Sequence, residues 1–245
     1  MKILICEDDF MMAKAIEHRL TRDDYQVTVA PDGKVAAERV KAEDFDLIIT
    51  DLLMPFFGGL ELINLVRNQL GKTVPIIVLS KLGNESTVVE AFKIGATDYI
   101  TKPFSPNELA IRIKKIQPAV AQPEVAEPAA PKAQKLIDLA YLRELASGDM
   151  SFMNEMVKYF IDNAPVLLIE MKASIDRKDW DTLREQANKF IHQLSFMGIK
   201  SILADVEAMD TILLTGRNTE KLDVMMDKIT RVSKDAIAEL RTLTG

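Results

Sequence analysis

Short runs of β-branched or aliphatic residues alternate with amphipathic stretches along the first half of the chain. The runs with the character of buried strands are residues 3–6, 26–30, 47–50, 76–80 and 98–101. The stretches with helical spacing that follow them are residues 11–20, 34–41, 59–70, 88–94 and 106–116. Continuous apolar strands are buried on both faces, so the pattern predicts an α/β fold, a doubly wound (βα)5 parallel sheet with helices on each side.

The pattern changes after residue 117. Residues 118–133 contain four prolines among alanines and a few charges, with no hydrophobic period, which predicts an extended linker. Beyond it strand patterns stop, and helical spacing fills residues 136–146, 152–163, 166–176, 180–197, 202–214 and 222–243. We therefore expect two domains, residues 1–117 and an all-α up-down helical bundle over residues 134–245.

The charge of the chain narrows the class of partner. Asp and Glu number 37 against 31 Lys and Arg, a formal net charge of -6, which argues against a nucleic-acid partner or an anionic membrane. The single cysteine, Cys6, allows neither an intramolecular disulfide nor a cysteine-rich zinc site. No apolar run is long enough for a signal peptide or a membrane span, so we expect a cytoplasmic protein without a membrane partner.

Carboxylates follow two of the predicted strands. Glu7 and Asp8 come directly after the first strand, and Asp51 follows the third. Asp9 is well placed to cap the next helix, but the same explanation fails for Asp51, which precedes Leu-Leu-Met-Pro. Carboxylates gathered at one sheet edge repel one another unless a cation neutralises them, and oxygen ligands suit Mg²⁺. The sequence therefore predicts a magnesium site.

Two further polar residues end the remaining strands. Ser80 closes the fourth strand and Lys102 follows the fifth. A hydroxyl and an ammonium at the same edge of the sheet complement an anion larger than a carboxylate, such as a phosphoryl group on Asp51. The set predicts a phosphorylation site.

These motifs resemble the response-regulator receiver domain of two-component signalling. The resemblance rests on Glu7-Asp8, the run over residues 51–59, Ser80 and the run over residues 95–104. It implies that Asp51 accepts a phosphoryl group from a phosphohistidine, so the expected partner is a sensor histidine kinase or a phosphotransfer protein. No glycine-rich ATP motif is present, and we expect no kinase activity, only a phosphoacceptor that assists its own phosphorylation and dephosphorylation.

The resemblance also implies a role for each site residue. Glu7, Asp8, Asp51 and the backbone carbonyl of Leu53 would hold Mg²⁺. Lys102 would pair with the phosphoryl group. Ser80 and Tyr99 would form a switch pair, the hydroxyl moving to the phosphoryl group and the ring turning inward behind it.

The second half is similar to a histidine phosphotransfer (HPt) domain, with one conspicuous difference. The spacing to Gly198 puts Asn188 at the phosphoacceptor position, and an amide cannot take a phosphoryl group as an imidazole does. His192 lies one helical turn farther along nearly the same face. The similarity implies a phosphorelay protein whose HPt-like bundle lacks the usual acceptor.

Several interpretations of the bundle stay open. It could dock receivers or kinases without carrying phosphate, His192 could have taken over the acceptor role, or Asn188 could be an engineered replacement of a native histidine. A rival from another class is a phosphorylation-gated interaction or dimerisation protein with no onward transfer. Another receiver domain is a candidate partner of the bundle, and a homodimer is left open.

Overall fold

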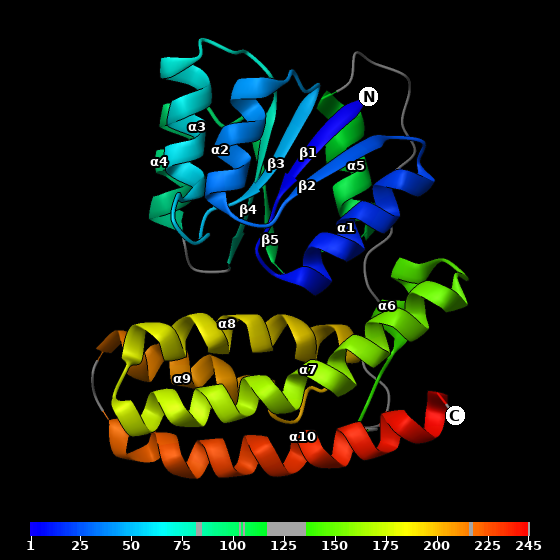
Figure 1. The fold of residues 1–245 in the computed structure, drawn as a ribbon, viewed down its shortest axis with the longest axis vertical. Coiled ribbons are helices and arrows are strands. Elements are labelled where there is room, and N and C mark those ends of the chain that lie inside the picture. The colour runs from blue at the N-terminus through cyan, green and yellow to red at the C-terminus, as the bar shows by residue number, and fades with distance from the viewer. Residues whose placement is uncertain (82–84, 103, 105, 117–135, 216–217, 245) are drawn as a thin grey trace. The chain divides into compact units, whose positions relative to one another are not determined.

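The computed structural model describes residues 1–81, 85–102, 104, 106–116, 136–215 and 218–244. The chain forms two compact units, Met1–Ala126 and Glu127–Gly245, which are described separately (Figure 1). The linker predicted over residues 118–133 lies outside the described residues.

The first unit is built on one parallel sheet. Its strands are β1 (Lys2–Cys6), β2 (Gln26–Ala30), β3 (Leu47–Asp51), β4 (Ile76–Lys81) and β5 (Asp98–Lys102). They are ordered β2-β1-β3-β4-β5, and each neighbouring pair is parallel. The five predicted strands and the doubly wound α/β fold are confirmed.

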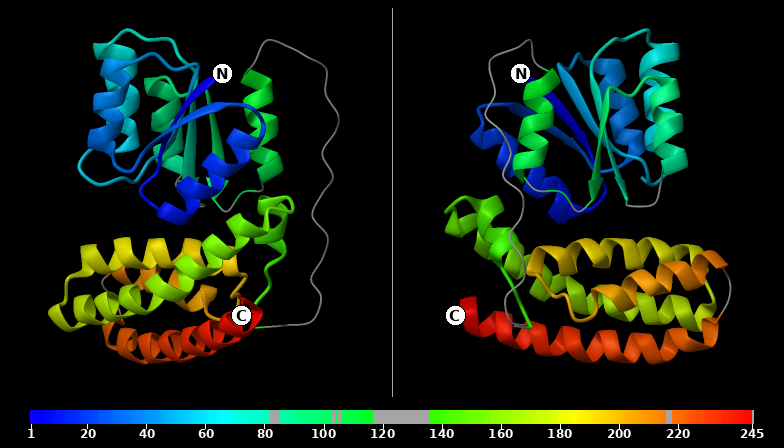
Figure 2. Two further views of the ribbon diagram at one scale, coloured as in Figure 1. Left: turned by 45° about the vertical axis from the view of Figure 1, so that its right-hand side comes forward. Right: turned by 180° about the vertical axis from the view of Figure 1, so that it is seen from behind.

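Helices cover both faces of this sheet. They are α1 (Phe10–Arg22), α2 (Gly33–Ala42), α3 (Gly59–Asn64), α4 (Glu85–Ile94) and α5 (Pro106–Ile116). Helices α2, α3 and α4 lie on one face, and α1 and α5 lie on the other (Figures 1 and 2). Leu4 and Cys6 of β1 pack in the core under α2 and α3, and the alternating residues Ile3 and Ile5 are fully buried as well. Burial on both faces explains why the central strands β1, β3 and β4 are rich in apolar residues, whereas the edge strands β2 and β5 are more exposed.

The end of α3 departs from regular α-helix. A π-helical turn, Leu65–Gln69, continues it and carries Arg67. The Arg67 guanidinium donates to the backbone carbonyls of Lys72, Val74 and Gly95 at 2.8, 2.7 and 3.0 Å. The Arg67 side chain thereby joins the end of α3 to the segment before β4 and to the turn before β5. These bonds hold the three segments together.

The second unit is helical throughout its described residues. Its helices are α6 (Ala140–Ala146), α7 (Met150–Arg177), α8 (Trp180–Met197), α9 (Leu203–Thr215) and α10 (Leu222–Thr244), with a 3₁₀ turn at Thr219–Lys221. The four long helices run side by side (Figure 2). Side chains such as Phe160, Phe190 and Ile229 are fully buried among them. The predicted all-α unit is confirmed.

One predicted boundary in this unit is wrong. Two helices were expected over residues 152–163 and 166–176, whereas the structure has the single helix α7 running through Pro165. Proline removes one backbone donor and disfavours a helix interior. The buried stripe Phe160, Ala164, Leu168 and Met171 continues at helical spacing on both sides of it, and its packing holds the helix together.

The loop that precedes α6 packs against the end of α8. Gly198 caps α8 with φ +63°, a left-handed conformation that glycine adopts without strain. A β-carbon on Gly198 would lie 2.0 Å from the Asp138 carbonyl oxygen, and the Asp138 N–H donates to the Met197 carbonyl at 3.3 Å. Only glycine allows this backbone contact.

Candidate functional site

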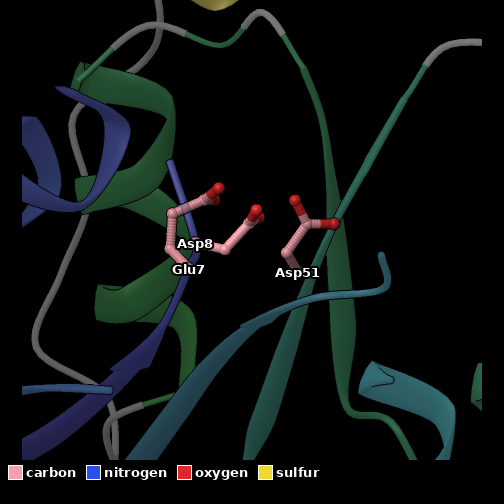
Figure 3. Close-up of side chains that lie close together, drawn as sticks. All are labelled: Glu7, Asp8 and Asp51. Atoms are coloured by element: carbon pink, nitrogen blue, oxygen red, sulfur yellow. The ribbon is translucent and has the colours of Figure 1, made fainter. Parts of the chain in front are cut away.

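Three carboxylates meet at the carboxyl edge of the sheet. Oxygens of Glu7, Asp8 and Asp51 lie within 4.8 Å of one another (Figure 3). The topology explains the meeting, because β1 and β3 are parallel neighbours and Cys6 pairs with Thr50. Glu7 and Asp51, the residues that follow this pair, therefore lie at the same level of the sheet edge. The expectation that these acids gather is confirmed by the geometry.

Lys102 reaches the same place from the far side of β4. Its Nζ lies 2.6 Å from Asp51 Oδ2 and 2.6 Å from Glu7 Oε2. The Lys102 side chain is buried, and so is that of Glu7. The hydrogen bonds that a buried ammonium donates to two carboxylates are charge-assisted and therefore strong. Lys102 thus belongs to the acidic pocket formed by Glu7, Asp8 and Asp51.

Burial and charge oppose one another inside this pocket. Burial raises the pKa of the Glu7 carboxyl, and the neighbouring charges of Asp51 and Asp9 add to that effect, although Lys102 counteracts it. Burial by itself would lower the pKa of the Lys102 ammonium, but the carboxylates of Asp51 and Glu7 outweigh it and raise that pKa. One ammonium faces three acidic side chains, so the pocket keeps an excess of negative charge.

Backbone contacts orient the Asp51 side chain. Its Oδ1 accepts a hydrogen bond from the Leu53 N–H at 3.0 Å, while Oδ2 is the oxygen that contacts Lys102. The loop after Asp51 closes through the Gly59 N–H, which donates to the Leu52 carbonyl at 3.0 Å. Leu53 therefore lies beside Asp51 and bonds to its carboxylate through the backbone N–H, while the metal-binding role of the Leu53 carbonyl stays a prediction.

The neighbouring acid Asp9 has the structural role that the sequence indicates. It is the N-cap of α1, and its Oδ1 accepts from the Met12 N–H at 2.8 Å. This bond satisfies one of the free donors of the first helical turn. Asp9 therefore caps the helix, whereas Glu7, Asp8 and Asp51 face the pocket.

Ser80 and Tyr99, the predicted switch pair, lie on the neighbouring strands β4 and β5. Ser80 is buried one residue beyond Leu79, which pairs with Asp51. The Tyr99 ring is partly exposed and lies edge-on to Phe92 of α4, with ring centroids 5.9 Å apart. In this structure the ring therefore lies on the edge strand of the sheet, packed against α4 and partly open to solvent.

In the helical unit, Asn188 and His192 lie one turn apart on α8, and both are half-buried. Neither residue belongs to the buried stripe of that helix, which contains Leu183, Ala187 and Leu194. One turn before Asn188, Arg184 Nε lies 2.7 Å from Asp210 Oδ1 of α9. The sequence prediction did not identify this ion pair.

A residue near the pocket that the sequence did not single out is Phe56. Its side chain is 87% exposed and its φ is +68°, although it follows Asp51 by only five residues. A positive φ at an aromatic residue is rare and cannot be inferred from the pattern of apolar positions.

The donor set of the pocket fits a hard divalent cation. Glu7, Asp8 and Asp51 each offer carboxylate oxygens, and the excess negative charge left by Lys102 is the charge that such an ion would neutralise. Among the described residues no helix is both long enough and apolar enough to cross a membrane.

Comparison with known families identifies the first unit. Residues 3–114 match the family model described as the response regulator receiver domain. These residues form a receiver domain. The match covers the sheet, its helices and the acidic pocket, so the receiver domain of two-component signalling is confirmed for this part of the chain. The match ends before the helical unit begins.

Relatives with curated names are transcriptional regulators. The chain is 36% identical over 114 residues to the transcriptional regulatory protein CrdR of Helicobacter pylori, covering 46% of this chain and 54% of that protein. It thus spans about half the length of that relative. It is 28% identical over 252 residues to the transcriptional regulatory protein SrrA of Staphylococcus aureus, covering 100% of this chain and 92% of that protein.

Two solved structures are similar to part of the chain. One is the receiver domain of the Francisella response regulator 1452, 36% identical, covering 47% of this chain and 94% of that one with a TM-score of 0.45. Another is the chemotaxis response regulator CheY4 of Vibrio cholerae, 31% identical, covering 47% and 97% with a TM-score of 0.45.

Proposed function

We propose that Asp51 accepts a phosphoryl group from a phosphohistidine on a histidine kinase or phosphotransfer protein, in a reaction that depends on Mg²⁺. The observation that carries this proposal is the pocket itself. Asp51 lies within hydrogen-bonding distance of Lys102 and beside two further acids at the carboxyl edge of a parallel sheet. Ligands of doubly wound sheets bind at that edge.

Glu7, Asp8 and Asp51 are the side chains that would hold Mg²⁺, together with the Leu53 carbonyl that the resemblance implies. Bound there, the ion would offset the negative charge that accumulates as a phosphoryl group approaches three carboxylates. An ion with affinity for the folded pocket also stabilises the fold by mass action, which can be measured without any phosphodonor.

The transfer itself requires few groups from the protein. A carboxylate oxygen of Asp51 forms a bond to phosphorus as the phosphorus–nitrogen bond of the phosphohistidine breaks, and the departing imidazole nitrogen keeps the electron pair and gains a proton from water. Lys102, already a cation in the pocket, stabilises charge on the transferred group. Hydrolysis of the resulting acyl phosphate by water returns Asp51 and inorganic phosphate.

The phosphoryl group then changes what Ser80 can bind. It adds about -1.5 to -2 of charge and new acceptor oxygens at Asp51, and Ser80 lies buried at the end of the adjacent strand. Ser80 would donate a hydrogen bond to the phosphoryl group, and the Tyr99 ring, now edge-on against Phe92, would turn inward. This motion is the signal that the domain passes on.

The helical unit is the proposed output, as an HPt-like bundle over residues 134–245 joined by the linker of residues 118–133. Asn188 cannot carry phosphate, so the bundle would bind a receiver or a kinase without onward transfer, unless His192 accepts phosphate and completes a relay. A phosphorylation-gated interaction or dimerisation protein is the remaining alternative. The half-buried positions of Asn188 and His192 are compatible with each of these.

A second candidate output is transcriptional regulation through DNA. It is favoured by the names of the two relatives, one of which aligns with the full chain. It conflicts with the expectation of no nucleic-acid partner, since Asp and Glu outnumber Lys and Arg between residues 136 and 245. Salt-dependent binding of the phosphorylated chain to DNA fragments, measured by fluorescence anisotropy, would decide between the candidates.

The experiment that tests the proposed function is transfer from autophosphorylated histidine kinases, with Mg²⁺, to the intact chain and to Asp51→Asn and His192→Ala. Acid- and base-stability of the label, with peptide mass mapping, locates the phosphoryl group. We expect base-labile label on Asp51 in the unchanged chain and in His192→Ala. Label on His192 that requires Asp51 would establish a relay, and the absence of label from Asp51 with every kinase would contradict the proposal.

A further inference from the structure

Phe56 stands out from the other exposed apolar residues of the receiver domain because its backbone is strained. The Phe57 N–H donates to the Pro55 carbonyl at 2.8 Å, which makes a γ-turn centred on Phe56 with φ +68°. This form of the turn is uncommon and costly for a residue with a side chain. Strain of this kind is retained where the surrounding structure or the function requires it.

The residues on both sides of Phe56 are anchored to α2. The Gly33 N–H points to the Pro55 carbonyl at 3.4 Å, and a β-carbon on Gly33 would lie 1.6 Å from the Phe57 carbonyl oxygen. Phe57 itself packs against the core of the domain. With its neighbours held against α2, Phe56 turns the other way, and its ring is 87% exposed.

Phe56 lies in the loop between β3 and α3, which begins directly after Asp51 at the carboxyl edge of the sheet. Leu53, which lies between Asp51 and Phe56, is 52% exposed, and Phe10, directly after the acids at the end of β1, is 39% exposed. Asp51 itself is only 9% exposed. The segments that follow the acids of β1 and β3 therefore carry exposed apolar side chains, whereas the acceptor is buried.

We propose that Phe56 is a specificity-determining contact for the phosphohistidine-bearing protein that delivers the phosphoryl group. The inference rests on the proposed function. A donor imidazole must bring phosphorus to Asp51 in line with a carboxylate oxygen, so the protein surface around that imidazole must cover the loops at the pocket rim. Aromatic side chains in such positions commonly supply a large share of binding energy. A small phosphodonor has no such surface and does not need the ring.

This difference between donors defines the experiment. The protein donor is the fastest of the histidine kinases from the source organism, each autophosphorylated with radiolabelled ATP and tested against the intact chain. The small donor is acetyl phosphate with Mg²⁺. Rates of Asp51 labelling by both donors are measured for the unchanged chain, Phe56→Ala, Phe56→Gly, Phe56→Tyr and the control Val89→Ala, which shortens an exposed apolar side chain on α4.

We expect Phe56→Ala and Phe56→Gly to lower kcat/KM for the protein donor by about tenfold or more, through a higher KM. Labelling by acetyl phosphate should stay within about twofold of the unchanged chain. Phe56→Tyr, which retains the ring, and Val89→Ala should behave as the unchanged chain with both donors. Because glycine relieves the strained φ, Phe56→Gly should have a higher melting temperature than the unchanged chain. Its phosphoryl transfer from the protein donor should still be slower, so a loss of donor recognition is distinguished from a loss of folding.

Equal rates from the protein donor for all variants would overturn the inference. So would a parallel loss with both donors in Phe56→Ala and Phe56→Gly, because the ring would then act on the pocket and not on the partner. A failure of acetyl phosphate to label Asp51 in the unchanged chain would instead contradict the proposed function, so the two failures are distinguishable.

Discussion

At the scale of single residues, the carboxylates of the pocket repel one another, and the single ammonium of Lys102 neutralises only part of their negative charge. Lys102 contacts Glu7 and Asp51 at 2.6 Å each, yet the pKa of Glu7 remains raised by burial. Without a bound cation, such a site lowers the stability of the folded domain. Destabilising groups of this kind are typical of functional sites.

Replacing Lys102 by Met should destabilise the receiver domain by about 3 kcal/mol in EDTA, because it leaves buried carboxylates without their ammonium. Glu7 has a folded pKa above its unfolded value, so it favours folding below the unfolded pKa and loses that contribution as the pH rises through the folded pKa. The substitution raises the folded pKa further, and the deficit should therefore grow from mildly acidic to mildly alkaline pH.

Urea denaturation across that pH range measures the effect. Lys172→Met, which breaks the exposed ion pairs of Lys172 with Asp176 and Asp223 in the helical unit, is the control and should change stability far less. A loss for Lys102→Met that is the same at every pH would contradict this account of the pocket.

At the scale of elements, a few backbone contacts decide how segments meet. Gly198 ends α8 with a positive φ and lets the Asp138 backbone approach, and Arg67 ties three carbonyls at the end of α3. Neither contact follows from the hydrophobic pattern that identifies the elements themselves.

Gly198→Ala should destabilise the helical unit by about 3 kcal/mol, since a β-carbon would both overlap the Asp138 carbonyl and adopt a strained φ. Gly148→Ala is a matched control, because Gly148 also has a positive φ, +89°, but no atom lies within 4 Å of its β-carbon position. It should cost about 1 kcal/mol. Thermal unfolding monitored by circular dichroism compares the two, and equal losses would show that overlap with Asp138 is unimportant.

The hydrophobic pattern predicted the strands and helices well, but it predicted helix boundaries and loop conformations less well. The central strands β1, β3 and β4 are buried on both faces, and the edge strands β2 and β5 were predicted from their β-branched residues. Glu7, Asp51 and Lys102 followed from where the strands end. The continuity of α7 was missed, since proline is a strong helix breaker locally and only the packed stripe around Pro165 overrides it. The strained φ of Phe56 depends on contacts with α2 and has no local signal.

At the scale of the whole molecule, a receiver domain precedes a helical unit that lies outside the residues matched to that family. Whatever the helical unit binds, the account requires that the phosphorylation state of the first unit controls it.

The central claim is that Asp51 is the Mg²⁺-dependent phosphoacceptor, and the most direct measurement is labelling of the intact chain with acetyl phosphate. Intact-protein mass and peptide mapping are compared with Mg²⁺ and with EDTA, for the unchanged chain and for Asp51→Asn. The account predicts one base-labile phosphoryl group on Asp51, present with Mg²⁺, lost in EDTA and absent from Asp51→Asn. Equal labelling of Asp51→Asn, or no labelling of the unchanged chain with Mg²⁺, would contradict it.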